Sequence, residues 1–171
     1  GLLPPNLHVV YAGNWLGHGA CTEPVMPWDG PVGNGDASGG VVDRGTTKRA
    51  ADVAVDAEYA FYQKTGSVLR SAAMIELLVN LVNVQYERDV DITHLISTIF
   101  VRTTQIYIIG GPNLVGQVRT QWNTNHTDVQ RDVVLFLDGN GEGGQAFQTG
   151  AVCNVTNAYA GAGMDPLTLH Y

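Results

Sequence analysis

The chain has little cysteine, little positive charge and no long apolar run. It contains only two cysteines in 171 residues, which excludes a scaffold held by several disulfides. Its nine lysines and arginines face 16 acidic residues and leave a net charge of −7, so nucleic acid and anionic membranes are unfavourable partners. No apolar run approaches the roughly 18 residues that a membrane-spanning helix needs, which also argues against a membrane.

Length and composition predict one compact domain. A chain of 171 residues with 44% hydrophobic content can bury a core without a second module. The chain begins at Gly1 without a methionine or a charged leader, which indicates a processed or trimmed product. Acidic, glycine-rich and lysine-poor chains are typical of extracellular proteins. We therefore expect a secreted protein.

Residues 1–47 predict an irregular N-terminal arm or propeptide remnant. This segment holds five of the seven prolines and a dense run of glycines, which interrupt every potential helix. Its one regular stretch, Leu7–Tyr11, is short enough to add to a sheet as an edge strand. We expect Trp15 and Trp28 to pack onto the domain or onto another chain, because a solvent-exposed arm carrying both would favour aggregation.

Residues 48–159 predict an α/β domain. Alanine and valine alternate with acidic residues in Ala51–Ala57, as in a strand, and an aromatic anchor of tyrosine and phenylalanine follows. Ser67 is a suitable N-cap for a helix over Val68–Tyr86, whose broad apolar face predicts a helix mostly buried against a sheet. Ile92–Arg102 carries β-branched residues on both faces and predicts a central strand. Strand, helix and strand together predict a parallel pair with a right-handed crossover.

The second half of the domain predicts one more helix and two more strands. Pro112 and Asn113 open a helix with an apolar stripe of Leu114, Val115, Val118 and Trp122. Val133–Leu137 predicts a buried strand, 138–144 a hairpin turn, and Gln145–Val152 a further strand. The expected fold is a mixed, mostly parallel twisted sheet with two packed helices, and residues 160–171 are expected to form a C-terminal tail.

The glycine-rich loop 138–144 imitates two kinds of ligand-binding loop. Its glycines satisfy GxGxxG after a strand, but a dinucleotide site needs a helix opening at the last glycine, and Gln145 onward predicts a strand. Its Asp138, Asn140 and Glu142 imitate the start of a calcium loop, but Thr149 stands where the bidentate carboxylate is required. A hairpin turn explains the loop better than either site.

The five histidines do not form a recognisable metal site. His94 lies in a predicted strand and His126 follows a predicted helix, and neither has a second histidine or cysteine at ligand spacing. His126 with Asp128 and Asp132 could form a small metal patch, although Asp132 is better explained by pairing with Arg131 or by capping the approach to the strand. No GxSxG serine occurs either. We expect no catalytic residue, metal or cofactor in this chain.

Two covalent features are left open by the sequence. Cys21 and Cys153 could form one long-range disulfide or remain two unrelated thiols. In the chain-entropy model such a bridge would contribute about 4–5 kcal/mol. Asn125 and Asn154 each begin an Asn-x-Thr glycosylation sequon, which fits a secreted chain.

Short sequence segments, spread over about two thirds of the chain, resemble those of a known family. They comprise residues 75–90, with Asn80-Leu-Val-Asn83 and Tyr86-Glu-Arg-Asp89, followed by Trp122, Arg131-Asp132 and Gly150-Ala-Val-Cys-Asn154. In order and spacing these segments resemble reprolysin-like (adamalysin-type) metzincin metallopeptidases, with bacterial secreted members the nearest.

The resemblance implies a zincin-like upper subdomain of strand, helix, strand, helix, strand and strand. The last strand of that subdomain is an exposed edge with which an extended peptide substrate pairs. Carried over, this edge is Gln145, Ala146, Phe147 and Gln148, whose backbone would hold the peptide. The family's cysteine at the position of Cys153 pairs with one beyond the zinc helix, whereas this sequence offers only Cys21.

The sequence departs from that family because it lacks HExxHxxGxxH, the motif that binds the catalytic zinc. Three interpretations remain open. The chain is part of a zinc peptidase whose zinc-binding half lies elsewhere, a non-catalytic binding or self-assembly domain, or a secreted adhesion-type domain. We expect a peptide or protein partner, and a second copy or second polypeptide covering the exposed sheet. Zinc is expected only with a missing C-terminal half.

Overall fold

The computed structural model describes residues 49–109, 113–140, 143–152 and 154–167, together with the backbone of residues 7–12. The described elements are six strands and three helices. Their bounds are β1 Leu7–Ala12, β2 Arg49–Ala57, α1 Tyr59–Thr65, α2 Val68–Val90, β3 Ile92–Arg102, α3 Leu114–Asn125, β4 Val133–Asp138, β5 Gly143–Ala146 and β6 Tyr159–Gly163.

The strands form one mixed sheet in the order β1-β3-β2-β4-β6-β5. The inner neighbours β3, β2, β4 and β6 pair in parallel, and the two outer strands β1 and β5 pair antiparallel to their neighbours. β2 and β3 are parallel strands joined through α1 and α2, as the strand-helix-strand pattern predicts. The mixed, mostly parallel α/β architecture predicted from the sequence is therefore confirmed.

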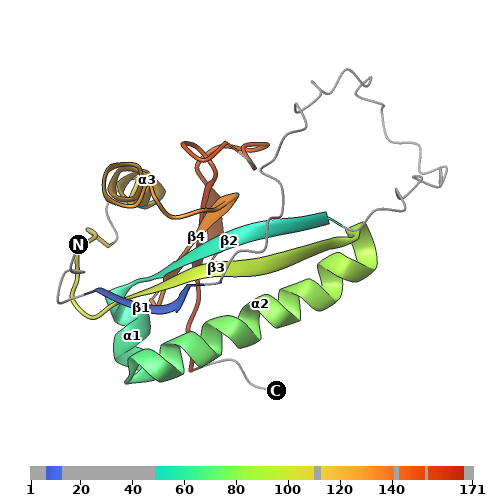
Figure 1. Cartoon of the computed structure of the whole chain (residues 1–171). Helices are drawn as coiled ribbons and strands as arrows, with labels where there is room; N and C mark the ends of the chain where they lie inside the picture. Colours follow the sequence, from blue (N-terminus) through green and yellow to red (C-terminus); the bar gives the residue numbers. More distant parts are fainter. Residues whose placement is uncertain (1–6, 13–48, 110–112, 141–142, 153, 168–171) are drawn as a thin grey trace.

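The helices cover both faces of this sheet. Figure 1 shows α3 on one side, and α1 and α2 on the other. The alternation in β2 divides its side chains between these layers, because successive residues of a strand point to opposite faces. Val53 and Val55 join the core beneath α1 and α2, whereas Ala54 and Asp56 face the layer of α3.

The helix between β2 and β3 begins where the sequence predicts. The Ser67 side chain accepts a hydrogen bond from the backbone N–H of Arg70 at 3.2 Å, which caps the start of α2. The preceding residue, Gly66, has φ 78°, a left-handed conformation that ends α1. α1 itself corrects the prediction of two helices, because the aromatic residues expected as a simple anchor form a third, short helix capped by Glu58.

The predicted burial of α2 is wrong for much of the helix. Only Ser71, Ala72, Ile75 and Val79 are buried. The C-terminal half extends along the outer part of the sheet, where Leu81 is 53% exposed and Val84 70% exposed. The apolar stripe is wider than the surface that the sheet offers.

α2 also corrects the prediction that no segment of the chain is long and apolar enough to span a membrane. By length and composition it passes the criterion for a membrane span, with a mean hydropathy of 1.3 over an 18-residue window. Only 22% of that window is buried in the structure, where α2 packs on β3 through the buried residues named above. A single helix that meets this criterion is weak evidence for a membrane span.

The C-terminal strands differ from the prediction in three ways. β5 pairs with β6 and not with β4, so residues 138–144 do not form the predicted hairpin turn. β5 ends at Ala146, well short of Val152. β6 was not predicted, because Tyr159–Gly163 consists mainly of glycine and alanine, which have low strand propensity. A Cβ at Gly161 would lie 3.2 Å from Cγ2 of Val115, so this small residue lets α3 pack closely on β6.

The N-terminal segment contains the predicted edge strand. β1 pairs antiparallel with β3, Leu7 opposite Arg102 and Ala12 opposite Thr98. Trp15, Trp28 and both cysteines lie outside the described residues, so the expected tryptophan packing and the Cys21–Cys153 bridge are not tested.

Candidate functional site

The outer strand β5 is exposed over its whole length. It pairs with β6 on one side, with Gly143 opposite Gly163 and Ala146 opposite Ala160, and stands last in the strand order. Residues 143–150 are all exposed. Of the predicted edge residues, Gln145 and Ala146 lie in this strand, and Phe147 and Gln148 follow it directly.

The pairing pattern shows which backbone groups of β5 face outward. The N–H of Phe147 donates to the carbonyl oxygen of Tyr159 at 2.8 Å, so the backbone of Phe147 faces β6. Backbone direction alternates along an antiparallel pair. Gln145 therefore also faces β6, while the N–H and C=O groups of Gly144 and Ala146 face away from the sheet. These outward groups can accept another strand.

A shallow depression adjoins this edge on the side of α3. It has a volume of about 200 Å³ and lies between the start of α3 and the strands β5 and β6. Leu114, Val115 and Phe136 line it together with Gly144 and Gly161. An extended peptide paired with β5 would place every second side chain toward one face of the sheet. The depression is suited to a small side chain of that peptide.

Arg119 lies at the far end of the same edge. Its guanidinium lies 4.7 Å from the centre of the Phe147 ring, and its Nε donates to the Thr156 carbonyl oxygen at 2.7 Å. These contacts tie α3 to both ends of the connection between β5 and β6. The position of Phe147 is therefore held by its contact with Arg119 of α3 as well as by its pairing with β6.

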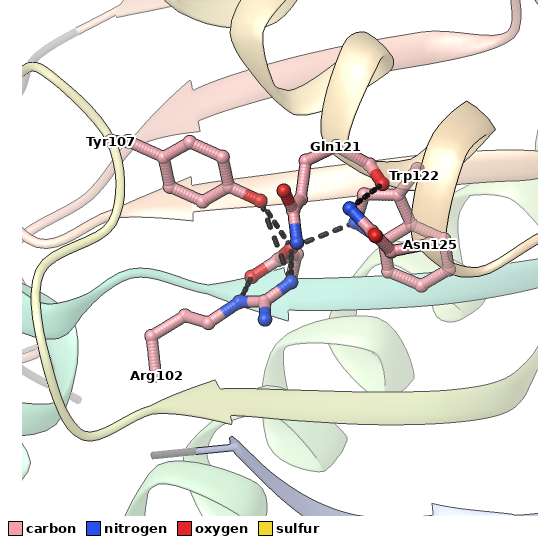
Figure 2. A network of polar contacts seen from close by, with 6 residues as sticks. Arg102, Tyr107, Gln121, Trp122 and Asn125 are labelled. Atoms are coloured by element: carbon pink, nitrogen blue, oxygen red, sulfur yellow. Dashed lines mark hydrogen bonds and ion pairs between the residues drawn. The ribbon is translucent and has the colours of Figure 1, made fainter. Parts of the chain in front are cut away.

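A buried polar network lies deeper, between the sheet and α3 (Figure 2). The Asp56 carboxylate is fully buried and forms a bidentate pair with Arg102, with oxygen–nitrogen distances of 2.8 and 2.6 Å. Tyr107 Oη and Trp122 Nε1 each donate to Asp56 Oδ2 at 2.7 Å. The network joins β2, β3, α3 and the segment before α3.

The electrostatics of this network fit a structural role. Burial raises the pKa of the Tyr107 hydroxyl, and the Asp56 carboxylate raises it further, so the phenol stays protonated and donates. Burial opposes the charge on Arg102, but the Asp56 carboxylate outweighs it and raises the pKa of the guanidinium. All four side chains are inside the core and each bonds to another, which leaves none to act on a substrate.

Acidic groups at the carboxyl ends of β2 and β4 are also occupied by the fold. Burial raises the pKa of Glu58, and the neighbouring Asp138 and Asp56 carboxylates raise it further, against the lowering effect of the Ala60 backbone N–H. That N–H donates to Glu58 as the cap of α1. Asp138 accepts from the backbone N–H of Asn140 at 2.9 Å.

Among the described residues, the side chains of His126 and His94 lie on different faces of the sheet and do not form a site together. The His126 ring packs against Phe100 and Trp122, with ring centres 4.6 and 5.1 Å apart. Burial lowers the pKa of His126, and the nearby Arg102 lowers it further. His94 lies in β3, where Nδ1 is 2.9 Å from Asn83 Oδ1, and burial lowers its pKa as well.

The proposed metal patch is occupied by structural contacts. The Asp132 carboxylate accepts from the backbone N–H of Asp52 at 2.8 Å, and its own N–H donates to the Asp52 carbonyl at 2.8 Å. Asp132 therefore extends the pairing of β2 with β4, the strand-capping role favoured from the sequence. Within the described ranges no three His, Cys, Asp or Glu residues are grouped to hold a metal ion.

Both sequon asparagines are accessible. Asn125 is the exposed last residue of α3, and Asn154 is exposed in the segment before β6. The Thr156 hydroxyl of the second sequon donates to Asn154 Oδ1 at 2.8 Å.

Sequence reasoning did not find the Asp56 network. The available signal was a second aspartate in the strand of alternating acidic and apolar residues, and an arginine closing another strand. Their contact depends on the register of β2 with β3, in which Asp56 lies opposite Phe100, two residues before Arg102. Comparison with protein-family models and with curated proteins yields no match to this chain.

Proposed function

We propose that this chain binds an extended peptide along β5, as the substrate-binding part of a secreted, reprolysin-like metallopeptidase domain. The observation that carries the proposal is an antiparallel outer strand, exposed throughout, at the end of a parallel sheet. Such edges bind peptides by main-chain hydrogen bonds, with adjoining depressions selecting side chains.

The order of elements supports the same proposal. Strand, helix, strand, helix, strand and strand follow one another from β2 to β5, if α1 and α2 count as one helical connection. This is the order that the resemblance to reprolysin-like peptidases implies. The accessible sequons fit a secreted chain.

Zinc does not fit the residues of this chain. The sequence has no HExxHxxGxxH, and the part of the chain that the structure describes groups no three metal-ligating side chains. Peptide hydrolysis would need three histidine ligands and a glutamate from another segment or polypeptide. We propose binding for this chain and leave the hydrolytic step to that missing part.

A proline scan of β5 tests the proposal. The probe is a fluorescein-labelled, end-blocked decapeptide of alternating threonine and alanine, measured by fluorescence anisotropy. Ala146→Pro removes an outward N–H without removing a bond to β6, and proline is tolerated on edge strands. Ala146→Thr is the matched control, since it keeps the N–H.

We expect Ala146→Pro to weaken binding about 3- to 10-fold, the loss of one hydrogen bond, and Ala146→Thr to bind like the original chain. Equal affinity of all three proteins, or no binding to any, would contradict the proposal.

The second candidate function is a non-catalytic assembly subunit. The observation in its favour is the apolar surface of α2, where Leu69, Leu81, Val84 and Val90 are exposed. Surfaces of this kind mark interfaces between protein chains. Light scattering across a concentration series decides between the two candidates, because assembly through α2 predicts a mass that rises above 18.3 kDa.

A further inference from the structure

At the other edge of the sheet, the described strand β1 accompanies only part of β3. β1 pairs with β3 from Thr98 to Arg102, which is the C-terminal half of β3. In the described part of the chain no strand accompanies residues 92–97 on that side. Figure 1 shows β3 continuing past the end of β1, with α2 running beneath it.

A side chain of α2 occupies the backbone of β3 at this place. The N–H of His94 donates to Asn83 Oδ1 at 2.7 Å, and Asn83 Nδ2 donates to the His94 carbonyl at 2.9 Å. One donor and one acceptor on a planar amide are what the peptide group of a neighbouring strand would present. The Asn83 amide thus takes, at His94, the position that the peptide group of a neighbouring strand would take.

A groove runs along the same edge. It has a volume of about 610 Å³ and lies between the C-terminal half of α2 and the N-terminal half of β3. Val79, Val84, Leu95 and Ile96 supply apolar lining, and Glu76 and Glu87 supply negative charge. The lining includes no lysine or arginine.

The charge of the groove indicates its occupant. The lining carboxylates attract a lysine- or arginine-bearing segment and repel an acidic one. A second copy of this chain carries a net charge of −7 and is a poor match. The register of β1 on β3 provides the line along which such a segment can continue.

We propose that an extended, basic segment of another protein adds to β3 over residues 92–97 and displaces the Asn83 amide. Asn83 is then an autoinhibitory contact, because its amide occupies the N–H and C=O groups of His94 until a basic strand binds there. This interaction is separate from peptide binding at β5 and lies at the opposite edge of the sheet.

The test uses two labelled, end-blocked decapeptides, one of alternating lysine and threonine and one with glutamate in place of lysine. All proteins carry Ala146→Pro, which weakens the β5 edge equally in every variant, so differences between the variants arise at β3 and a failure there is distinct from a failure at β5. Anisotropy titrations are made at low ionic strength, where surface charge is least screened.

Three results are expected. The lysine peptide binds more tightly than the glutamate peptide. Glu76→Lys weakens binding of the lysine peptide about 3- to 5-fold and strengthens binding of the glutamate peptide, because Glu76 is an exposed lining residue. Asn83→Ala, which removes the competing amide, strengthens binding several-fold, whereas Asn80→Ala one turn away does not.

Two results would overturn the proposal. Equal affinity for both peptides, unaffected by Glu76→Lys, would show that the groove does not select basic segments. Dimerisation of Asn83→Ala without peptide, measured by sedimentation, would identify a second copy as the occupant.

Discussion

The two faces of the sheet are held together by different interactions. Beneath α1 and α2 the core cluster is aliphatic and aromatic, as with Val55, Phe61 and Ile75, and the hydroxyls of Thr65 and Ser71 are buried beside it as a hydrogen-bonded pair. Beneath α3 a fully buried ion pair, Asp56 with Arg102, lies among Phe100 and Trp122. An apolar layer tolerates any close-packed arrangement of suitable volume, whereas a charged pair tolerates one geometry. We infer that the α3 face fixes the register of the strands and the α2 face supplies mainly hydrophobic stabilisation.

The largest effect is expected from breaking the ion pair. Asp56→Ala leaves the Arg102 guanidinium buried without its partner and removes the acceptor of Tyr107 and Trp122. We expect a loss of about 3–5 kcal/mol in the free energy of unfolding, measured by urea denaturation. Asp56→Leu combined with Arg102→Met should cost less than Asp56→Ala alone, because no charge stays buried. A loss below about 1 kcal/mol for Asp56→Ala would show that the pair is not essential.

A smaller effect is expected on the apolar face. Ile75 is fully buried against the sheet, so Ile75→Ala should lower the free energy of unfolding by about 2–4 kcal/mol through lost burial and a cavity. Leu69→Ala on the same helix is the control, because Leu69 is 77% exposed and should change stability by less than about 0.5 kcal/mol. Equal losses for the two variants would mean that Leu69 is covered in solution.

The cap of α2 should contribute less than either core. Ser67→Ala removes the acceptor for the Arg70 N–H and should cost about 1 kcal/mol, with Ser67→Asp retaining most of the stability. Thermal unfolding of the three proteins checks this. A Ser67→Ala protein as stable as the original would contradict the assignment of the cap.

The smallest effect is expected in the pH dependence of the free energy of unfolding. It concerns His126, which lies on the α3 face of the sheet. Its pKa is lowered by burial and then by Arg102, so the unfolded chain binds the proton more readily than the folded one. The stability associated with His126 is complete above the unfolded pKa of about 6.5 and decreases as pH falls through the lower folded pKa. Urea denaturation at pH 7.5 and 5.5 should show this decrease.

His126→Phe should reduce that pH dependence, because the aromatic contacts remain and the titrating group is removed. An unchanged difference between the two pH values would assign the effect to other groups, with His94 the next to replace, since burial lowers its pKa too.

The parallel centre of the fold was predictable because its signals are local. The alternation of β2, the Ser67 cap of α2 and the β-branched residues of β3 each specify an element without reference to the rest of the chain. Their order then requires a parallel pair.

The C-terminal strands were not predictable in the same way. β6 is a strand because β4 and β5 supply hydrogen bonds on both sides, and no property of its glycines and alanines indicates that. The burial of the C-terminal half of α2 was also predicted wrongly. An apolar stripe shows which residues can be buried, but it does not show how much sheet surface is present to cover them.

The position of an outer strand near the candidate site could be predicted, but its pairing could not. The sequence resemblance predicted that Gln145–Gln148 would form the outer edge, and β5 does lie there with Gln145 and Ala146 in it. Which of its N–H groups point outward depends on the pairing of Phe147 with Tyr159, the first residue of β6, a strand that the sequence did not predict. Binding of a peptide at this edge stays a prediction.

The most direct test of that prediction is amide-resolved hydrogen exchange of the full chain, measured by NMR with and without the threonine–alanine decapeptide. The account predicts that the peptide slows exchange at the amides of Gly144 and Ala146, whose N–H groups face outward, and leaves Phe147 unchanged because its N–H already bonds to Tyr159. Unchanged exchange at Gly144 and Ala146 under saturating peptide, with protection appearing elsewhere on the sheet, would contradict it.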